Sequence, residues 1–406
     1  MSGRPPLVLG KHWLKGAVKT DTQSRENIMS NNVPEKGLQL RTLVKSSGEL
    51  ELSLAEVDVR KPNDDEIVIQ VEATPINPSD LGLLVGAADL SNAKQTGTAD
   101  RPVITAPVPA PAMRAMAARM DQSLAVGNEG AGTVVAAGSS DAAQALLGKK
   151  VTGLGGEFYA QYRILNVAQV MELPADASAR DGASCFVNPL TALSFPETMR
   201  MEGHKGLVHT AAASNLGQML NKICLADGVP LVNIVRKPEQ EKILRDLGAK
   251  HVVSTSSDSF MEELIDALAE TKATLGFDAV GGGPLTGQIL TAMEAAASRG
   301  AEYSRYGSAE PKHVYIYGRL DMSPTLIPPG VGMAWGTGGY LLTYFLQKVG
   351  AEGRAKLRKR VMDELKTTFA SHYTDELSLS EALNLDTLKA YNAKRTGEKY
   401  LINPTL

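Results

Sequence analysis

The sequence predicts an α/β protein in which a β-rich part is followed by a doubly wound parallel sheet. Residues 38–73 alternate apolar and polar side chains, which is the period of half-buried strands. Residues 206–250 read as strand, tight turn, helix and strand, which together form a βαβ unit. Two later strands, at 276–283 and 313–318, each end in glycine. The short Gly- and Val-rich strands give way to this pattern near residue 185, where we place the domain boundary.

Length and composition limit the class of protein. The 406 residues are 43% apolar and 21% charged, which suits two domains with a sizeable core. A net charge of −3 argues against nucleic acid or an anionic membrane as the main partner. Two distant cysteines, Cys185 and Cys224, exclude a disulfide framework and favour a reducing compartment. Because no apolar run is long enough to span a membrane, we expect a cytoplasmic protein.

The β-rich part is expected to begin after an N-terminal leader. Residues 1–36 contain a polar stretch of mixed charge without periodicity, so we expect them to be flexible and outside the fold. Strand patterns at 38–44 and 50–57 flank a Ser-Ser-Gly turn, which predicts a hairpin. Residues 66–73 predict a further strand. It leads into a proline-framed turn at 74–81.

A long segment, residues 87–126, interrupts the strands. It holds several prolines and a short Ala/Met helix at 113–120, and it is too long for a plain loop. We therefore expect an insertion near one rim of the β-rich domain. Residues 127–138 then read as a glycine-rich strand pair. At the other end of the chain, a helical stretch at 350–370 leads to a last strand at 399–402.

The tight turn of the βαβ unit is where a dinucleotide pyrophosphate binds. Small residues let the backbone approach the phosphates, and the following helix supplies free N–H groups and a positive dipole end. Of the usual three glycines only Gly217 is present, with Ala212 and Ser214 in the other two positions. The turn by itself is equally typical of a helix start that binds nothing.

The end of the second strand favours NADPH as the ligand of this turn. A site for NAD places Asp or Glu there to bond the ribose 2′-hydroxyl. This strand ends instead in Arg236 and Lys237. Considered alone, these two cations are typical of the solvent-exposed start of a helix. After a phosphate-binding turn, they indicate a site for the 2′-phosphate, with arginine offering bidentate donors.

The chain resembles the zinc-independent branch of the medium-chain dehydrogenase/reductase superfamily, which contains quinone oxidoreductases and enoyl-thioester reductases. The resemblance covers residues 37–406 and rests on six pieces in the family's order: Ile76-Asn77-Pro78-Ser79-Asp80, Gly127-Asn128-Glu129-Gly130-Ala131-Gly132-Thr133-Val134, Asn188-Pro189-Leu190-Thr191-Ala192, the βαβ unit, Tyr317-Gly318, and Gly397-Glu398-Lys399-Tyr400. It implies a GroES-like catalytic domain at 37–185, a Rossmann NADP-binding domain at 186–345, and a C-terminal return to the catalytic domain at 346–406. A substrate cleft lies between the two domains in this family.

The resemblance also implies the cofactor-binding residues and the oligomer. The expected NADP(H) contacts are Asn188, Thr191, Ala212, Ser214, Asn215, Leu216, Gly217, Arg236, Lys237, Gly281, Tyr317 and Gly318. Members of this family commonly form homodimers by joining the edges of their nucleotide-domain sheets, and the strand at 313–317 is the candidate edge. Trp335 and Tyr340 lie in a glycine-rich segment and suit either a substrate pocket or an interface.

No metal is expected. Zinc needs three or four Cys or His ligands brought together, and the six histidines show no ligand spacing. Without zinc, the alkoxide formed from a simple carbonyl lacks its stabiliser, so a quinone or an activated C=C bond fits better. The hydrogen-bonding candidates are Asn77, Ser79 and Asp80, with Tyr159 and Tyr162 as outside candidates. The same Asn-Pro-Ser-Asp run is also good turn chemistry, with Asp80 suited to cap a helix.

One departure from the family pattern leaves the substrate open. Enoyl-thioester reductases of this branch carry a catalytic tyrosine shortly after the Asn-Pro-x-Asp turn, and residues 81–126 contain none. We therefore predict an NADPH-dependent reductase of quinones or α,β-unsaturated carbonyl compounds. The alternatives are an enoyl-thioester reductase whose acid comes from another position, and a non-catalytic NADPH-binding protein.

Overall fold

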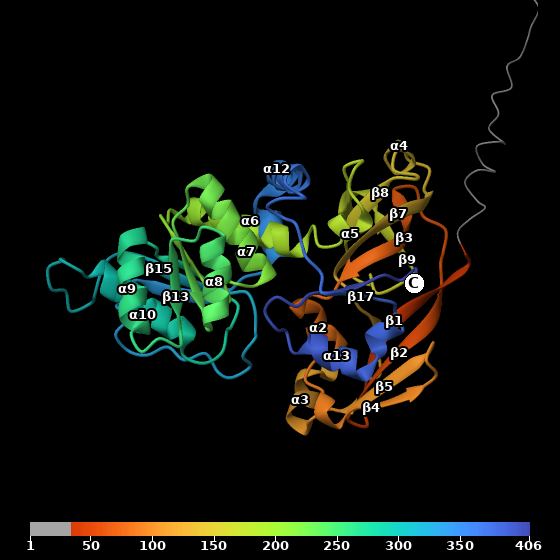
Figure 1. The fold of residues 1–406 in the computed structure, drawn as a ribbon, viewed down its shortest axis with the longest axis horizontal. Coiled ribbons are helices and arrows are strands. Elements are labelled where there is room, and N and C mark those ends of the chain that lie inside the picture. The colour runs from red at the N-terminus through yellow and green to blue at the C-terminus, as the bar shows by residue number, and fades with distance from the viewer. Residues whose placement is uncertain (1–33) are drawn as a thin grey trace, which may run out of the picture.

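The structure is a computed structural model that describes residues 34–406. The predicted leader, residues 1–36, therefore lies almost entirely outside the described residues, and Lys36 already begins the first strand. Two parts lie side by side, a parallel-sheet part and a β-rich part, with helices α6 (Val187–Glu202) and α12 (Gly350–Asp363) near their junction (Figure 1). Within the described residues, no helix combines the length and apolarity that a membrane crossing requires.

A five-stranded antiparallel sheet forms one layer of the β-rich part. Its centre is the predicted hairpin, β1 (Lys36–Lys45) and β2 (Glu49–Asp58), whose alternate side chains are buried. The segment expected as an insertion supplies both sides of this sheet, because β5 (Pro102–Pro107) pairs with β2 and β6 (Ser123–Ala125) pairs with β1. The strand β4 (Lys94–Gly97) forms the edge beyond β5.

The helix expected at 113–120 is shifted. It forms as α3 (Ala110–Ala115), followed by a 3-10 turn, η2 (Ala117–Arg119). Pro109 and Pro111 favour a start before residue 113, since proline suits the first turn of a helix. Another 3-10 turn, η1 (Leu90–Asn92), precedes β4.

The second sheet of the β-rich part carries the candidate catalytic turn. Its strands from this part of the chain are β3 (Glu66–Pro75), β7 (Glu129–Ala137), β8 (Lys150–Leu154), β9 (Tyr162–Asn166) and β10 (Val170–Glu172). The glycine-rich stretch at 127–138 was predicted as a strand pair, and this is wrong: it is the single strand β7. Gly132 is needed there because a Cβ atom would lie 1.9 Å from the carbonyl oxygen of Gln70 on β3. The close packing of β7 on β3 explains the glycines that suggested a turn. Short helices and one 3-10 turn connect these strands: α2 (Pro78–Leu84), α4 (Asp141–Gln144), η3 (Val167–Gln169) and α5 (Ala179–Gly182).

The parallel sheet contains six strands in the order β13-β12-β11-β14-β15-β16. The strands are β11 (Leu207–His209), β12 (Leu231–Val235), β13 (His251–Ser254), β14 (Leu275–Asp278), β15 (Lys312–Ile316) and β16 (Trp335–Gly339). Helices α7 (Asn215–Asp227), α8 (Pro238–Asp246), α9 (Phe260–Thr271) and α10 (Leu285–Ala297) connect the first five strands. The chain order along the sheet is 3-2-1-4-5-6, which is the doubly wound topology.

The candidate edge strand was placed wrongly. The strand predicted at 313–317 corresponds to β15, which pairs with β14 on one side and β16 on the other. β16 is the edge strand. Its glycines hid it from a search for β-branched and aromatic residues.

The C-terminal segment returns to the β-rich part. After α11 (Leu342–Lys348) and α12, the short strands β17 (Asp375–Leu377) and β18 (Tyr400–Ile402) pair with each other. β18 also pairs antiparallel with the end of β3. A 3-10 turn, η4 (Glu381–Leu383), and helix α13 (Leu385–Asn392) lie between them. The last strand therefore sits beside the proline-framed turn, more than 300 residues away in sequence.

One buried core crosses the junction between the two parts. It joins Ala73 and Ala131 of the β-rich sheet to Leu207 and Phe277 of the parallel sheet, and Phe195 of α6 packs in the same cluster. Burial of this apolar surface fixes the two parts against each other. The two parts are thus held together by packing as well as by the chain.

Candidate functional site

The predicted phosphate turn has the geometry of an anion-binding helix start. Ser214 precedes α7, and its Oγ accepts a hydrogen bond from the N–H of Gly217 at 3.1 Å. A Cβ atom on Gly217 would lie 2.2 Å from the carbonyl oxygen of Ala212, so the turn closes only with glycine there. The N–H groups of Asn215 and Leu216 have no acceptor within residues 34–406. Free N–H groups at a helix start are what a phosphate requires.

Arg236 and Lys237 lie next to this turn. The N–H of Ala212 donates to the carbonyl oxygen of Ile234, two residues before Arg236. Arg236 and Lys237 are both exposed, and the guanidinium of Arg236 has no hydrogen bond or ion pair with any described residue. Their backbone N–H groups donate to Oε1 of Gln240 at 2.9 and 3.1 Å. Gln240 therefore fixes the loop while leaving the Arg236 side chain free.

The ends of β14 and β15 form the next part of the same sheet edge. Gly281 has a positive φ of 78°, and a Cβ atom on it would lie 2.6 Å from the carbonyl oxygen of Gly318. The carboxylate of Asp278 is fully buried and accepts hydrogen bonds from Thr210 and Thr286 at 2.7 and 2.6 Å. Asp278, which the sequence analysis did not single out, therefore ties the end of β14 to the segment after β11 and to the start of α10.

Tyr317 is partly buried at this edge, and its side chain packs against the core that crosses the junction. Its hydroxyl lies 2.7 Å from Nε2 of His209, with the two rings stacked at 18°. Burial lowers the pKa of His209 to about 3, so the imidazole is neutral. Nδ1 of His209 is buried without a partner among the described residues. The contact between His209 and Tyr317 therefore holds the end of β11 and the residue after β15 together.

Asn188 and Thr191 lie in the first two turns of α6. Asn188 is partly buried, whereas the Thr191 hydroxyl donates to the carbonyl oxygen of Val187 at 2.5 Å within the helix. The start of α6 is bound to the β-rich part, because the N–H groups of Phe186 and Val187 donate to Oε2 of Glu129 at 2.8 and 2.9 Å.

The three catalytic candidates have different environments. Asn77 is the N-cap residue of α2 and is almost fully buried, whereas Ser79 is exposed and its hydroxyl accepts from the Asn128 side chain at 3.0 Å. Asp80 was suggested as the helix cap, and it is instead the third helical residue, whose carboxylate accepts from the N–H groups of Asn77 and Asn128. Asp80 thus stabilises the turn that carries Asn77.

A buried polar cluster surrounds Asn77. Its Nδ2 donates to Oε1 of Glu129 at 2.8 Å, and its Oδ1 accepts from Nζ of Lys399 at 3.3 Å. Lys399 also lies over the ring of Tyr373, with Nζ 5.9 Å from the ring centroid. Glu129 and Lys399 both occur in the family-like pieces of the sequence, but no sequence pattern indicated that they meet. Only the pairing of β18 with β3 brings Lys399 to this turn.

Burial shifts the pKa values of this cluster toward neutral forms. It raises the pKa of Asp80 to about 7, although the two N–H donors partly oppose this. Burial likewise raises the pKa of Glu129. The pKa of Lys399 is lowered to about 8 by burial, while the nearby Glu129 acts in the opposite direction. Perturbed titratable groups at a junction between two sheets are typical of functional sites.

Two side-chain hydrogen bonds connect the elements that are predicted to bind the cofactor phosphates with the C-terminal segments that carry Tyr373 and Lys399. Asn215, at the start of α7, donates to Ser371 at 3.2 Å. Gln240 donates to Thr396 at 2.7 Å. Ser371 is two residues from Tyr373, and Thr396 is three residues from Lys399. The predicted cofactor elements and the polar cluster therefore face one junction.

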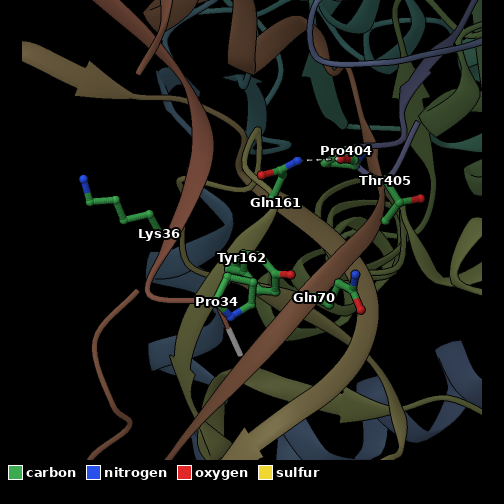
Figure 2. A pocket seen from close by; sticks show the side chains of 7 residues that line it. All are labelled: Pro34, Lys36, Gln70, Gln161, Tyr162, Pro404 and Thr405. Atoms are coloured by element: carbon green, nitrogen blue, oxygen red, sulfur yellow. Dashed lines mark hydrogen bonds between the residues drawn. The ribbon is translucent and has the colours of Figure 1, made fainter. Parts of the chain in front are cut away.

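Tyr159 and Tyr162, the outside candidates, lie in different places: the Tyr159 hydroxyl reaches the proline-framed turn and interacts with Asp80, whereas Tyr162 does not lie at this turn. Tyr159 is buried in the β-rich core, and its hydroxyl lies 3.3 Å from the carbonyl oxygen of Pro75. Tyr162 lines a pocket of about 330 Å³ with Pro34, Lys36, Gln70, Gln161, Pro404 and Thr405 (Figure 2). All these residues come from the β-rich part and the C-terminal residues, so this pocket is separate from the cofactor elements.

The remaining candidates for metal or redox chemistry are buried. Cys185 and Cys224 are both free and buried, and burial raises the pKa of each thiol. No three His, Cys, Asp or Glu side chains in residues 34–406 are grouped so as to hold a metal ion.

Comparison with known proteins gives relatives for this architecture. No protein-family model matches the chain. It is 29% identical over 214 residues to a mitochondrial enoyl-[acyl-carrier-protein] reductase from Xenopus tropicalis, a match that covers 50% of this chain and 52% of the relative. It is 25% identical over 159 residues to a quinone oxidoreductase from Pseudomonas aeruginosa, covering 38% and 49% of the two chains. The chain thus spans about half the length of the curated relatives it matches.

Solved structures match over nearly the whole described chain. A Mesorhizobium loti protein assigned as an NADPH:quinone reductase is 25% identical, with a TM-score of 0.70 over 92% of this chain and 100% of that one. The Escherichia coli quinone oxidoreductase, solved as a complex with NADPH, is similar in fold, with a TM-score of 0.64 and 16% identity over 91% of this chain and 100% of that one. The predicted fold class and family resemblance are confirmed, since homologues and structural neighbours are quinone oxidoreductases and enoyl reductases of the zinc-independent medium-chain branch.

Proposed function

We propose that this protein is a zinc-free NADPH-dependent reductase that transfers a hydride to a quinone or an α,β-unsaturated carbonyl compound. The observation that carries the proposal is the meeting of two features at one junction. A helix start with free N–H groups, beside an exposed arginine, lies on the parallel-sheet side. The buried Asn77 and Glu129 lie on the other side with the partly buried Lys399. Ligands of doubly wound sheets bind at the carboxyl ends of the strands, where this junction lies.

The residues present fit NADPH. The open N–H groups of Asn215 and Leu216 suit the pyrophosphate, and Arg236 with Lys237 suits the 2′-phosphate. We assign Gly281 and Gly318 to the same site, where the two strand ends pack so closely that neither position tolerates a side chain. We propose that the side chains of Asn188, Thr191 and Tyr317 also line the NADPH site. When bound, the cofactor supplies a hydride.

The choice of acceptor rests on chemistry that needs no metal. A quinone or an enone delocalises the charge that develops after hydride addition, and hydrogen bonds then stabilise it. Asn77 orients Lys399 and Glu129, while the exposed Ser79 is the candidate that a substrate can contact directly. An enoyl-thioester substrate is the second candidate, because several matched relatives are enoyl-[acyl-carrier-protein] reductases.

Three further properties belong to this proposal. Zinc independence is supported by Asn77-Pro78-Ser79 at the position where zinc-binding relatives carry a ligand. A homodimer is supported by the edge position of β16 in the parallel sheet and by exposed apolar side chains in the same stretch of the chain, such as Met333 and Trp335. A reducing compartment such as the cytoplasm is supported by two free, buried thiols.

A panel of quinones, enones and enoyl-CoA esters, followed at the NADPH absorbance band, tests the function. We expect NADPH oxidation with quinones or enones and slower oxidation of NADH. A preference for enoyl-CoA esters would establish the second candidate. Tight NADPH binding without oxidation by any acceptor would instead indicate a non-catalytic NADPH-binding protein. Elemental analysis that found one zinc per chain would contradict the zinc-free assignment.

A further inference from the structure

The sequence analysis did not identify a proton donor for the predicted site. The fold brings one candidate, the side chain of Lys399, to Asn77 of the proline-framed turn. Lys399 immediately precedes β18, whose backbone is fixed against the end of β3: the N–H of Ile76 donates to the carbonyl oxygen of Tyr400 at 2.9 Å. The backbone of Lys399 is also held by Thr374, through bonds of 3.1 and 2.7 Å. The position of the Lys399 Cα atom is therefore set from two sides.

The ammonium group of Lys399 retains free donors. Its contact with Oδ1 of Asn77 at 3.3 Å uses one of its three N–H groups. No described residue accepts from the other two, and no carboxylate lies within ion-pair distance of Nζ. An ion pair would hold the proton on the amine. The Asn77 amide therefore separates Lys399 from the carboxylate of Glu129 without forming one.

We propose that Lys399 is the catalytic acid that delivers the proton after hydride addition. This assignment rests on the proposed reductase function. Hydride addition to the β-carbon of an enone leaves an enolate. The N–H bond of Lys399 then breaks, a C–H bond forms at the α-carbon, and the electron pair remains on the neutral amine. Water returns a proton to the amine. The hydride supplies both electrons and one hydrogen, and the amine supplies one proton, which together complete the two-electron reduction of the C=C bond.

The charged groups around Lys399 suit a proton donor near neutral pH. Glu129 on β7, Asp80 on α2 and the Cys185 thiol before α6 raise its pKa, while burial lowers it and brings the pKa to about 8. The ring centroid of Tyr373 lies 5.9 Å from Nζ of Lys399, and the Arg180 guanidinium lies 5.1 Å from the same centroid. A general acid works best when its pKa is close to the operating pH. Because only the ammonium form donates, the enone rate should fall as pH rises through about 8.

Substitution of Lys399 tests the assignment. Lys399→Met removes the proton, and Lys399→Arg keeps the charge on a guanidinium that does not release a proton. We expect each to lower kcat for an enone by about 100-fold or more, which is the usual contribution of a general acid. The quinone rate should fall less, because a hydroquinone anion is already delocalised. The NADPH Kd should change less than about threefold. Lys389→Met on the exposed face of α13 is the matched control and should retain full activity.

Two outcomes overturn the assignment while leaving the proposed function intact. One is an active wild-type enzyme whose enone kcat is unchanged in Lys399→Met or Lys399→Arg. The other needs no turnover: after reductive ¹³C-methylation, the NMR signal that disappears in Lys399→Arg should titrate near pH 8, and titration above about pH 10 overturns the proposal. A wild-type protein inert toward every acceptor would reject the reductase function itself and this assignment with it.

Discussion

Arg236 is the residue on which the choice between NADPH and NADH depends. Its guanidinium is exposed and free, and the fold places it beside the phosphate turn. A charged hydrogen bond contributes about 1.5–3 kcal/mol, which corresponds to roughly 10- to 100-fold in affinity. We expect Arg236→Ala to raise the Kd of NADPH by that factor and to leave the Kd of NADH unchanged. Fluorescence titration measures both, with Lys242→Ala on α8 as the control. Equal affinity of the wild type for both cofactors would contradict the site.

His209 determines part of the pH dependence of stability. The unfolded chain takes up a proton near the ordinary histidine pKa of 6.5, whereas burial lowers the pKa of folded His209 to about 3. Between these values the unfolded state holds more protons, so stability falls as pH drops. The loss amounts to about 2 kcal/mol from pH 6.5 to about pH 5.

Urea unfolding of the wild type and His209→Gln checks this expectation. Glutamine removes the titrating ring, so the variant should lose less stability than the wild type over the same pH interval. The absolute stability of the variant is expected to be lower, because the contact with the Tyr317 hydroxyl at 2.7 Å changes. Parallel pH profiles for the two proteins would show that His209 does not carry the dependence.

At the scale of elements, α8 connects the cofactor loop with the C-terminal segment. Gln240 uses its oxygen to hold the N–H groups of Arg236 and Lys237, and its nitrogen to reach Thr396. Gln240→Ala removes all three bonds, whereas Thr396→Val removes only the last. We expect the NADPH Kd to rise about five- to tenfold in Gln240→Ala, or about 1 kcal/mol of binding energy in total, because the loop that carries Arg236 is no longer held. In Thr396→Val the rise should be about twofold or less, because the loop keeps its two bonds to Gln240. Isothermal titration calorimetry measures the NADPH Kd of both variants. Equal increases in Kd for the two variants would show that the Gln240–Thr396 hydrogen bond, and not the hold on the Arg236 loop, contributes the binding energy.

At the scale of the whole molecule, β16 leaves one edge of the parallel sheet open. Lys312 donates to Ala334 and Tyr340 donates to Ile316, so the alternating backbone groups of Trp335, Thr337 and Gly339 face away from β15. Most of the exposed large apolar side chains within residues 34–406 fall in the stretch of sequence that contains this strand: Tyr303, Tyr306, Leu320, Met322, Leu326, Met333, Trp335, Leu341 and Tyr344. Such an edge is a template for pairing with a second copy.

The edge therefore predicts the oligomeric state. Thr337→Pro removes one outward N–H and should convert a dimer into a monomer, because proline cannot donate to a strand of the partner. Light scattering after size-exclusion chromatography measures the mass. Leu225→Glu on α7 changes an exposed apolar residue away from β16 and should remain dimeric. A Thr337→Pro protein of unchanged dimeric mass would place the interface elsewhere.

The pattern of local residues was enough to predict most elements. Alternation predicted β1, β2 and β3, and the βαβ unit predicted β11, α7 and β12, because these periods reflect which faces are buried. The strands β4, β5 and β6 within residues 87–126 were not predicted. Glycine-rich strands were also missed: β7 was read as a pair, and β16 was not recognised as a strand. In both, glycine is present because of close neighbours rather than a turn, as at Gly336, where a Cβ atom would lie 2.8 Å from the His313 ring.

The sequence by itself determined the fold class and the family resemblance, and it predicted the elements that we propose to bind the cofactor, since all of these depend on residues close together in the chain. The tertiary structure alone decided how the acidic and basic groups meet. Lys399 reaches Asn77 across 322 positions, and Glu129 reaches it across 52. Neither pairing has a local signature, because β18 and β7 are placed by hydrogen bonds to β3 and by burial in the shared core. The tertiary structure likewise made β16 the open edge, since strand order depends on which neighbours cover each strand.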